Sequence, residues 1–544
     1  MIRRRSSVIL SIIILLLCGV TANSSTDKGD QDAPIPDEIQ RIMNHPFYEG
    51  AIWGLRVVDL GTGELIYDLN PNMLLLMGSI RKLFTIGEAL DEFGVDFRFT
   101  TPVHRLGEVK EEGILHGGLI LVARGDLTMG GRVAPDGSMS IPNLDHNEAN
   151  SLGNAQLPNA DPLAGYDYLA RKVAESGIRE VKGDVIIDDR LFEPFNFRGE
   201  FDVTPIFVND DVVDVIVNPT ETGERASVDW RPKSAAFKVR SHVMTVAHGE
   251  EEDITLFSFV PSCIGLKRCF GVVRGQVPAD FLPPPPGNFL PLIQTFRIVE
   301  PSTYARTIFL EALERAGVKV NTDLIGPNPS EKLPPENSYT PHTKVAELVS
   351  LPYSEYAKLI LKISYNIGAD TSLVLWGLTQ GVNNMQETLD LERKHLMNIL
   401  GITDNEFHFV DGSSGGGSAV TTNATIKLLK GMSGTKVFHA YKASLPVLGI
   451  DGSLAFVNEF EKDDNLKGAK GNVFAKTGTF VEADNGSGIV IKAQAFAGYI
   501  DAKSGRQLVY ALFVNNVKAT NLVNDLVRIF QDEGITSAII WKEN

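Results

Sequence analysis

The sequence predicts an α/β fold of the α+β kind, with an antiparallel sheet and helices built from both ends of the chain and a large, mostly β insertion between them. Near the start, two strand-like runs flank a Gly-Thr-Gly turn, and a helical spacing of apolar residues follows. Near the end, helical segments precede two strand-like runs and a last helix. Between these ends, short β-like runs alternate with polar loops.

The composition excludes several classes of protein. The chain has 544 residues, enough for three or four domains at roughly 150 residues each. Hydrophobic residues make up 43% and charged residues 22%, which suits a packed core and excludes general disorder. The net charge of −17 argues against nucleic-acid binding, which needs a basic surface, and against a basic membrane-surface protein.

The first 22 residues have the pattern of a secretory signal. Three arginines at positions 3–5 precede an apolar stretch from Val8 to Val20, and a small-residue cleavage site ends at Ala22. A permanent anchor is the alternative, although the stretch is short for a membrane span. Lipidation of Cys18 is discounted because the large Leu17 precedes it. We expect an exported protein, periplasmic or extracytoplasmic, with no stable membrane span once the signal is removed.

The elements of the two ends can be placed from periodicity. We expect strands over 51–59 and 64–68 joined by the turn at Gly61–Gly63, and then a helix over 79–93. The second half is expected to contain helices at 353–363 and 370–378, a Gly-rich turn at 411–417, strands at 489–499 and 507–514, and a last helix at 521–531.

The middle of the chain, from about 101 to 338, differs from both ends in having short β-like runs separated by polar loops. Short β-like runs occur at 119–123, 184–188 and 212–217, and a helix is expected at 304–316. Four consecutive prolines, 283–286, mark an extended surface loop.

Three short motifs carry the chemistry: Ser79-Ile-Arg-Lys82, Ser364-Tyr-Asn366 and Lys476-Thr-Gly478. A serine hydroxyl needs a base within hydrogen-bond reach to act as a nucleophile. Residues i and i+3 of a helix share a face, so Lys82 can lie beside Ser79. Lysine acts as a base only when its ammonium is neutralised, which burial and a neighbouring cation such as Lys476 favour.

The remaining motif residues suit substrate binding. Ser364 can relay a proton to a leaving amine, and Asn366 can hold a substrate amide. Lys476 and Thr477 can bind a substrate carboxylate, and Gly478 lets a substrate backbone lie against the strand edge. The backbone N–H groups of Ser79 and Thr479 are placed to form an oxyanion hole.

Other matches are weaker. The S-x-x-K matches at Ser25 and Ser433 lie in a flexible lead and in a segment with no apolar helix after it. The G-x-S-x-G match around Ser414 lacks the helix that must directly follow a nucleophile elbow, so it is interpreted as a turn. No H-E-x-x-H motif or close His/Cys cluster appears, and we expect neither a metal nor another cofactor.

Cys263 and Cys269 are the two cysteines beyond the signal. In an oxidising compartment, their six-residue spacing favours a small-loop disulfide. A metal site is the alternative, but two thiols without a nearby His fall short of four ligands.

The three motifs together are typical of class A β-lactamases and penicillin-binding proteins. The chain resembles the class C penicillin-binding proteins, the D-alanyl-D-alanine carboxypeptidase/endopeptidases. Ser364 follows Ser79 by 285 residues, a separation that suits this family's large insertion and not a class A β-lactamase. The segments that carry the resemblance are Ser79–Thr85, Gly125–Asp126, Gly183–Asp188, Val208–Asp211, Leu313–Val318, Asp411–Ser413, Gly449–Gly452 and Ala475–Thr479.

The resemblance implies a serine β-lactamase/penicillin-binding-protein-like transpeptidase fold. It implies a discontinuous catalytic domain over 35–100 and 340–544, an accessory domain over 101–195 and 300–339, and a second one, over 196–299, nested in the first. It also implies that Ser79 is acylated by the penultimate D-Ala of a peptidoglycan stem peptide and that water or an amine resolves the ester. β-Lactam antibiotics are then expected as covalent inhibitors that acylate Ser79.

Two alternatives stay open from the sequence. A serine β-lactamase or esterase on the same fold needs a base for deacylation, and the candidates Glu387 and Glu392 sit in a charged helix that looks solvated. A cell-wall binding scaffold would have no need of Ser79 and Lys82. The chain also departs from the family, which usually has Pro-Ala before the nucleophile where Met77-Gly78 stands here; Gly78 is expected to loosen the helix start.

Overall fold

The computed structural model describes residues 34–258, 269–283, 287–484 and 488–544. The predicted signal at 1–22 and Cys263 lie outside the described residues. The α-helices are α1 (Asp37–Met43), α2 (Arg81–Phe93), α3 (Ala149–Leu152), α4 (Ala164–Glu175), α5 (Pro301–Arg315), α6 (Tyr353–Ile363), α7 (Asn366–Thr379), α8 (Met385–Leu400), α9 (Thr422–Ser433), α10 (Phe438–Ala443) and α11 (Leu522–Glu543). Two of the 3-10 helices matter for the site: η2 (Gly78–Ile80) and η4 (His146–Glu148).

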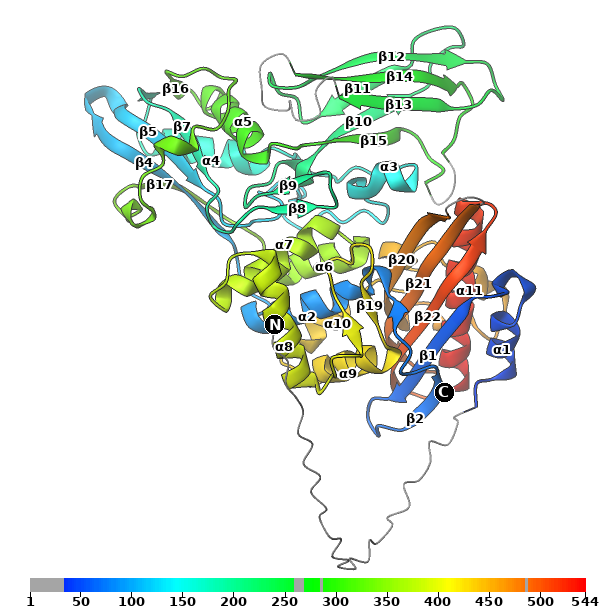
Figure 1. The fold of residues 1–544 in the computed structure, drawn as a ribbon. Helices are drawn as coiled ribbons and strands as arrows, with labels where there is room; N and C mark the ends of the chain where they lie inside the picture. The colour runs from blue at the N-terminus through cyan, green and yellow to red at the C-terminus, as the bar shows by residue number, and fades with distance from the viewer. Residues whose placement is uncertain (1–33, 259–268, 284–286, 485–487) are drawn as a thin grey trace, which may run out of the picture.

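A five-stranded antiparallel sheet joins the two ends of the chain, in the order β2-β1-β22-β21-β20. The N-terminal hairpin pairs with the C-terminal strand β22, as Figure 1 shows by the blue and red strands lying side by side. The strands are β1 (Ile52–Asp59), β2 (Leu65–Leu69), β20 (Val473–Asp484), β21 (Gly488–Asp501) and β22 (Gln507–Ala519).

Helices cover both faces of this sheet (Figure 1). Side chains alternate along β22: Tyr510 and Leu512 belong to the apolar cluster under α1 and α11, and Ala511 and Phe513 belong to the cluster that contains α2, α6 and α9. This alternation is the reason that β22 is buried on both faces. The sheet is therefore the middle layer of three, and the mixed architecture confirms the predicted α+β class.

The insertion leaves and returns through adjacent strands. β4 (Thr100–Lys110) follows α2, and β17 (Lys344–Val349), which precedes α6, pairs with it antiparallel. Their sheet has the order β16-β6-β5-β4-β17, with β7 beside β5. Its other strands are β5 (Ile114–Val122), β6 (Glu180–Val181), β7 (Val185–Asp188) and β16 (Lys319–Val320).

Two three-stranded sheets form the far part of the insertion, with orders β11-β10-β15 and β12-β14-β13. Their strands are β10 (Val212–Asn218), β11 (Ser227–Arg231), β12 (Lys238–Val246), β13 (Asp253–Ser258), β14 (Phe270–Pro278) and β15 (Leu292–Arg297). One apolar cluster runs through these sheets, α4 and α5. The nested domain boundaries drawn from the sequence stay a proposal.

A short hairpin of the insertion packs with the catalytic helices. β8 (Phe195–Phe197) and β9 (Phe201–Val203) contribute phenylalanines to the same cluster as α2 and α6. A second small sheet lies just before η2: β19 (Ala419–Val420) pairs antiparallel with β18 (Phe407–His408) on one side and with β3 (Leu75–Leu76) on the other. Both arrangements bring distant segments to the start of α2.

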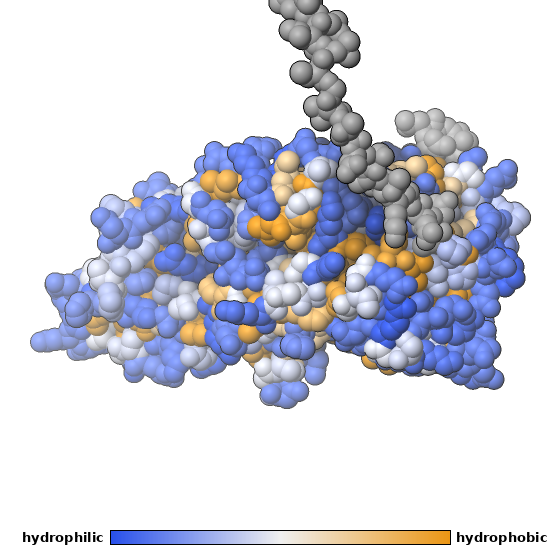
Figure 2. Space-filling view, turned by 90° about the horizontal axis from the view of Figure 1, so that it is seen from below, coloured by the Kyte–Doolittle hydropathy of each residue, from blue (hydrophilic) through white to orange (hydrophobic). Residues whose placement is uncertain are grey.

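Seen from below, the surface is mostly hydrophilic, with apolar side chains gathered toward its middle (Figure 2). In the part of the chain that the structure describes, no helix combines the length and apolar character needed to cross a membrane.

Candidate active site

Ser79 and Lys82 meet at the start of α2. Ser79 lies in η2, and Lys82 follows in the first turn of α2, so one helical turn places both side chains on the same face. Lys82 Nζ donates a hydrogen bond of 2.7 Å to Ser79 Oγ. The nucleophile and its candidate base are therefore already in contact.

Lys82 is completely buried and makes two further hydrogen bonds. Its Nζ donates to Asn366 Oδ1 at 2.6 Å and to the Ser413 carbonyl at 3.0 Å. Burial, with the charge of Arg198 as the next cause, lowers the pKa of Lys82 to about 7, against the opposing effect of nearby carboxylates. A large fraction of Lys82 is neutral at neutral pH and can accept a proton.

The second motif lies at the junction of two helices. Ser364 ends α6 in the left-handed region, at φ 64°, and Asn366 begins α7. Asn366 joins the Ser79–Lys82 pair through its amide oxygen, and its Nδ2 donates to Glu148 at 2.6 Å. Within the described chain, the Ser364 hydroxyl has no hydrogen bond to Ser79, Lys82 or Lys476, so the structure joins only Asn366 of this motif to the nucleophile.

The third motif lies on β20, the edge strand of the large sheet. Lys476 is completely buried, and its Nζ donates to the Thr477 carbonyl at 2.8 Å. Burial, followed by the charge of Lys82, lowers the pKa of Lys476 well below its usual value. The hydroxyl of Thr477 contacts Ser453 Oγ at 2.8 Å, and that of Thr479 donates to Gln494 Oε1 at 2.7 Å.

Two glycines allow β20 to press against η2. Gly78 has φ +49°, and a Cβ on it would lie 2.5 Å from the Thr479 backbone nitrogen. A Cβ on Gly478 would overlap the Met77 carbonyl. This glycine permits a close packing of backbones, and the expectation that Gly78 loosens the helix start stays a prediction. The amides of Ser79 and Thr479 consequently belong to adjacent backbone segments.

The Gly-rich turn at 411–417 supports the first turn of α2. Arg81 Nε and Thr85 Oγ1 donate to the carbonyls of Asp411 and Gly412, both at 2.7 Å. The Asp411 carboxylate accepts three backbone N–H groups of this turn, those of residues 413–415. The segment is a turn, as expected, and its role is to carry the Ser413 carbonyl that holds Lys82.

Glu392, one of the two glutamates of the charged helix α8, is buried and not solvated. Glu387 on α8 is exposed, but Glu392 is buried and pairs with Arg81 at 2.6 Å. The Arg81 guanidinium also lies over the Phe409 ring, 4.1 Å from its centre. The prediction that Glu392 is solvated is therefore wrong: its helix turns this residue inward, where a buried arginine needs an anion.

Sequence reasoning missed three residues of the site. Asp370, one turn after Asn366, accepts from Ser413 Oγ at 3.1 Å, and burial followed by the charge of Asp411 raises its pKa to about 8. Arg198 from the β8–β9 hairpin donates to the same hydroxyl at 3.3 Å. Glu148 reaches Asn366 from η4. Arg198 and Glu148 belong to the insertion and match no motif, so only the folded chain reveals them.

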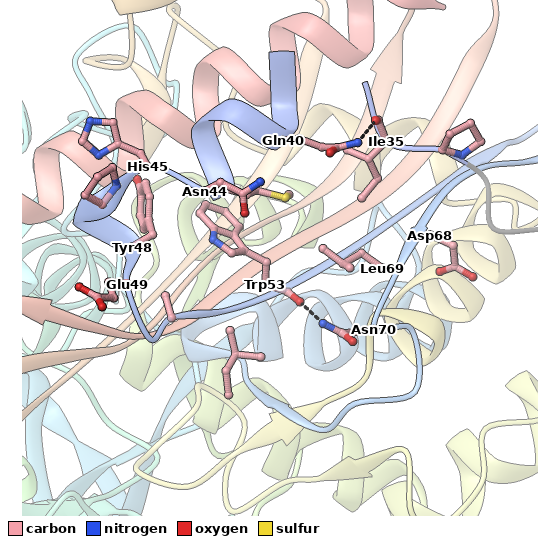
Figure 3. A pocket seen from close by; sticks show the side chains of 15 residues that line it. Ile35, Gln40, Asn44, His45, Tyr48, Glu49, Trp53, Asp68, Leu69 and Asn70 are labelled. Atoms are coloured by element: carbon pink, nitrogen blue, oxygen red, sulfur yellow. Dashed lines mark hydrogen bonds between the residues drawn. The ribbon is translucent and has the colours of Figure 1, made fainter. Parts of the chain in front are cut away.

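The remaining candidates lie apart from this centre. Ser433 Oγ donates to the Lys430 carbonyl at the end of α9. Cys269 is disulfide-bonded, and its predicted pairing with Cys263 stays a prediction because Cys263 lies outside the described residues. A hollow beside α1 and β1, in which Tyr48, Trp53 and Asn70 are drawn in Figure 3, contains none of the predicted site residues.

Comparison with known proteins identifies the family of this chain. Residues 36–531 match the model of the D-Ala-D-Ala carboxypeptidase 3 (S13) family. A D-alanyl-D-alanine carboxypeptidase of Actinomadura sp. (strain R39) is 27% identical over 94% of this chain and 87% of its own. Penicillin binding protein 4 of Haemophilus influenzae shares the fold, with a TM-score of 0.64, 16% identity, and 91% of this chain and 98% of that one covered.

The same Haemophilus influenzae protein complexed with a β-lactam superposes with a TM-score of 0.61 at 18% identity, over 93% of this chain and 99% of that one. The family match covers most of the chain and confirms the predicted resemblance, fold and class of enzyme, a serine-type carboxypeptidase. The chain belongs to the D-Ala-D-Ala carboxypeptidase 3 (S13) family.

Proposed function

We propose that Ser79 carries the acyl-enzyme of this carboxypeptidase and that its substrates are peptidoglycan stem peptides ending in D-Ala–D-Ala. The observation that carries the proposal is the contact between Ser79 Oγ and Lys82 Nζ, 2.7 Å apart, in which the lysine is buried and has a pKa of about 7. A base with a pKa near the working pH is the most effective proton acceptor.

Acylation follows from these positions. Lys82 takes the Ser79 proton as Oγ attacks the penultimate D-Ala carbonyl, and the N–H groups of Ser79 and Thr479 receive the developing oxyanion. The leaving D-Ala nitrogen regains a proton from Lys82, with Ser364 as relay. The close approach of β20 to η2 supports the role of Thr479, whereas the role of Ser364 rests on its motif.

Lys476 and Thr477 are assigned to the terminal carboxylate of the substrate. Lys476 is a buried amine that donates to a neutral carbonyl, and burial lowers its pKa, so a substrate carboxylate would favour its charged form by pairing with it. Gly478 keeps the strand edge clear for the substrate backbone, and Asn366 holds a substrate amide. The same binding would serve endopeptidase action, in which the leaving group is a cross-linked D-amino acid.

Two further expectations accompany this function. β-Lactams mimic the D-Ala–D-Ala end and would acylate Ser79. Export to a periplasmic or other extracytoplasmic compartment, where peptidoglycan lies, follows from the signal pattern of residues 1–22.

The test is intact-mass analysis of the mature chain after penicillin treatment, with the adduct mapped to a peptide. We expect one penicilloyl adduct on Ser79, none in Ser79→Ala, and D-Ala release from a D-Ala–D-Ala peptide by wild type alone. Equal labelling of Ser79→Ala, or an adduct on Ser414 or Ser433, would refute the assignment.

A further inference from the structure

We propose that Glu148, carried by the insertion, is the general base that activates water for hydrolysis of the acyl-enzyme. The inference rests on the proposed function, because it concerns the second half of that reaction. Acylation needs Lys82, but a hydrolase must also deprotonate the water that resolves the ester. The sequence between the second and third motifs contains no persuasive carboxylate for this step, and the structure brings one in from before the second motif.

Three hydrogen bonds connect Glu148 to the nucleophile. Glu148 Oε1 accepts from Asn366 Nδ2 at 2.6 Å, Asn366 Oδ1 accepts from Lys82 Nζ at 2.6 Å, and Lys82 donates to Ser79 Oγ at 2.7 Å. The Glu148 carboxylate also acts on the pKa of Lys82, which it raises. It is therefore linked by hydrogen bonds to the Ser79–Lys82 pair and is not an isolated surface charge.

The second carboxylate oxygen of Glu148 remains open to water. Ser151 Oγ donates to it at 3.5 Å, at the limit of a hydrogen bond. No lysine or arginine of the described chain forms an ion pair with Glu148, and the side chain is partly exposed. A base needs an oxygen that is not ion-paired and that water can reach, and Oε2, with one long hydrogen bond on a partly exposed residue, suits this role.

Buried groups hold the backbone on both sides of Glu148. Asp145 receives two hydrogen bonds from Arg132, at 2.6 and 2.8 Å, and His146 lies between Asp210 and Asp214, at 2.9 and 2.6 Å. After Glu148, the Asn150 side chain exchanges two hydrogen bonds with the backbone of β15 at position 295. These contacts order η4 before substrate arrives, as a catalytic group requires.

A contact with the catalytic domain fixes the same loop from its other end. Asn143 Oδ1 accepts from the Gly452 backbone N–H at 2.8 Å. The residues on either side of Glu148 are thus tied both to the insertion and to the loop beside β20.

The other carboxylates near Lys82 are less suited to the task. Asp370 has a pKa raised to about 8 by burial and accepts a hydrogen bond from Ser413, so it holds a proton at neutral pH. Both carboxylate oxygens of Asp411 already accept hydrogen bonds, from three backbone N–H groups. Glu392 is buried against Arg81. Glu148 is the member of this group with an oxygen left for water.

The step balances as ester hydrolysis. One water proton passes to Glu148 Oε2 while the water oxygen bonds to the acyl carbon. The bond from that carbon to Ser79 Oγ then breaks, and Oγ takes the proton that Glu148 received, passed on through solvent and Lys82. Lys82 ends neutral and Glu148 ends ionised, as both began this step, and the product leaves as a carboxylic acid that ionises.

Glu148→Gln separates the base from the hydrogen-bond acceptor, because the glutamine oxygen can still accept from Asn366. We would measure the acylation rate of wild type and of Glu148→Gln with a fluorescent penicillin at pH 8.5, where Lys82 is mostly neutral in both. Acyl-enzyme from a peptide ending in D-Ala–D-Ala would be trapped by acid quench and counted by intact mass. We expect acylation within about threefold of wild type, and hydrolysis of the acyl-enzyme slower by about 10² to 10⁴, with a burst of D-Ala.

Glu387→Gln, on the exposed start of α8, is the matched control and should change neither rate. Should Glu148→Gln melt early, Glu148→Ala with added formate replaces it, and formate should restore hydrolysis of the acyl-enzyme. Unchanged hydrolysis, an equal loss of both rates, or no rescue would overturn the role of Glu148. If wild type itself forms no adduct on Ser79, the proposed function fails instead.

Discussion

Replacing Gly78 with alanine tests whether the backbone contact between η2 and β20 shapes the active site. Alanine is the residue that this family usually has before the nucleophile, so the resemblance alone predicts a harmless change. The structure predicts the opposite. Gly78 has φ +49°, and a Cβ there would lie 2.5 Å from the Thr479 nitrogen and 2.8 Å from the Gly478 carbonyl carbon.

The magnitude follows from two separate costs. A non-glycine residue in the left-handed region costs about 1–2 kcal/mol. The overlap adds to this, because both contacted atoms are backbone and no side chain can rotate away. The relief available is a shift of β20 away from η2, which moves the Thr479 N–H from its place beside Ser79. Loss of one oxyanion donor lowers a rate by about 10² to 10³.

The assay is the second-order rate constant for acylation of Gly78→Ala by a fluorescent penicillin, measured by stopped flow. Gly505→Ala is the matched control, since Gly505, in the turn between β21 and β22, also has positive φ, +92°, but has open space around its Cβ position. We expect a loss of at least about tenfold for Gly78→Ala and none for Gly505→Ala. Acylation of Gly78→Ala within threefold of wild type would refute the reasoning.

Three further predictions follow from the buried charges. The acylation rate should rise with pH and reach half its plateau near pH 7, because Lys82 acts in its neutral form and its pKa is about 7; a pH profile of penicillin labelling that stays flat from 5.5 to 8.5 would contradict this. Glu392→Ala should destabilise the chain by about 3–5 kcal/mol in urea unfolding, since it leaves Arg81 buried without its anion, whereas Glu387→Gln should stay within about 0.5 kcal/mol. Burial opposes the charged form of His146, but Asp214 and Asp145 outweigh it and raise the pKa of His146 to about 9. The stabilisation from protonated His146 is therefore complete below pH 6.5 and is lost as pH rises through 9. Melting temperatures should fall over that range in wild type and fall less in His146→Gln.

The features that the sequence predicts well are those set by local geometry. The contact between Ser79 and Lys82 needs only one helical turn, and the apolar spacing of 79–93 already places that turn. The pairing of the N-terminal hairpin with β22 needs more, but the strands at both ends are long and apolar enough to be recognised. Burial of β1 and β22 along most of their length explains why these two runs are recognisable as strands.

Burial of single polar residues is harder to predict. Glu392 belongs to a helix that is rich in charged residues, and nothing in its spacing separates it from the exposed Glu387. Glu392 differs from Glu387 in its partner, Arg81 on α2, which lies more than 300 residues away in sequence. The Arg81 guanidinium is buried away from water and pairs with the Glu392 carboxylate. A pair of this kind is decided by how α2 and α8 pack, which neither helix encodes alone.

The same reasoning explains why the insertion's part in the site stays hidden in the sequence. Asp145, His146, Asn147 and Glu148 read as one polar loop, yet the first three are buried and only Glu148 retains access to solvent. Arg132 pairs with Asp145, and His146 lies between Asp210 and Asp214, so the partners of these buried residues come from two other segments of the chain, while Asn147 donates to Asp145 itself. The insertion begins at β4 and ends at β17, and these two strands pair next to α2 and α6. The loop that carries Glu148 can therefore reach Asn366 although it is distant in sequence. Motifs identify residues whose neighbours lie one turn or one strand away, whereas a carboxylate delivered by long-range packing becomes a candidate only when its contacts are known.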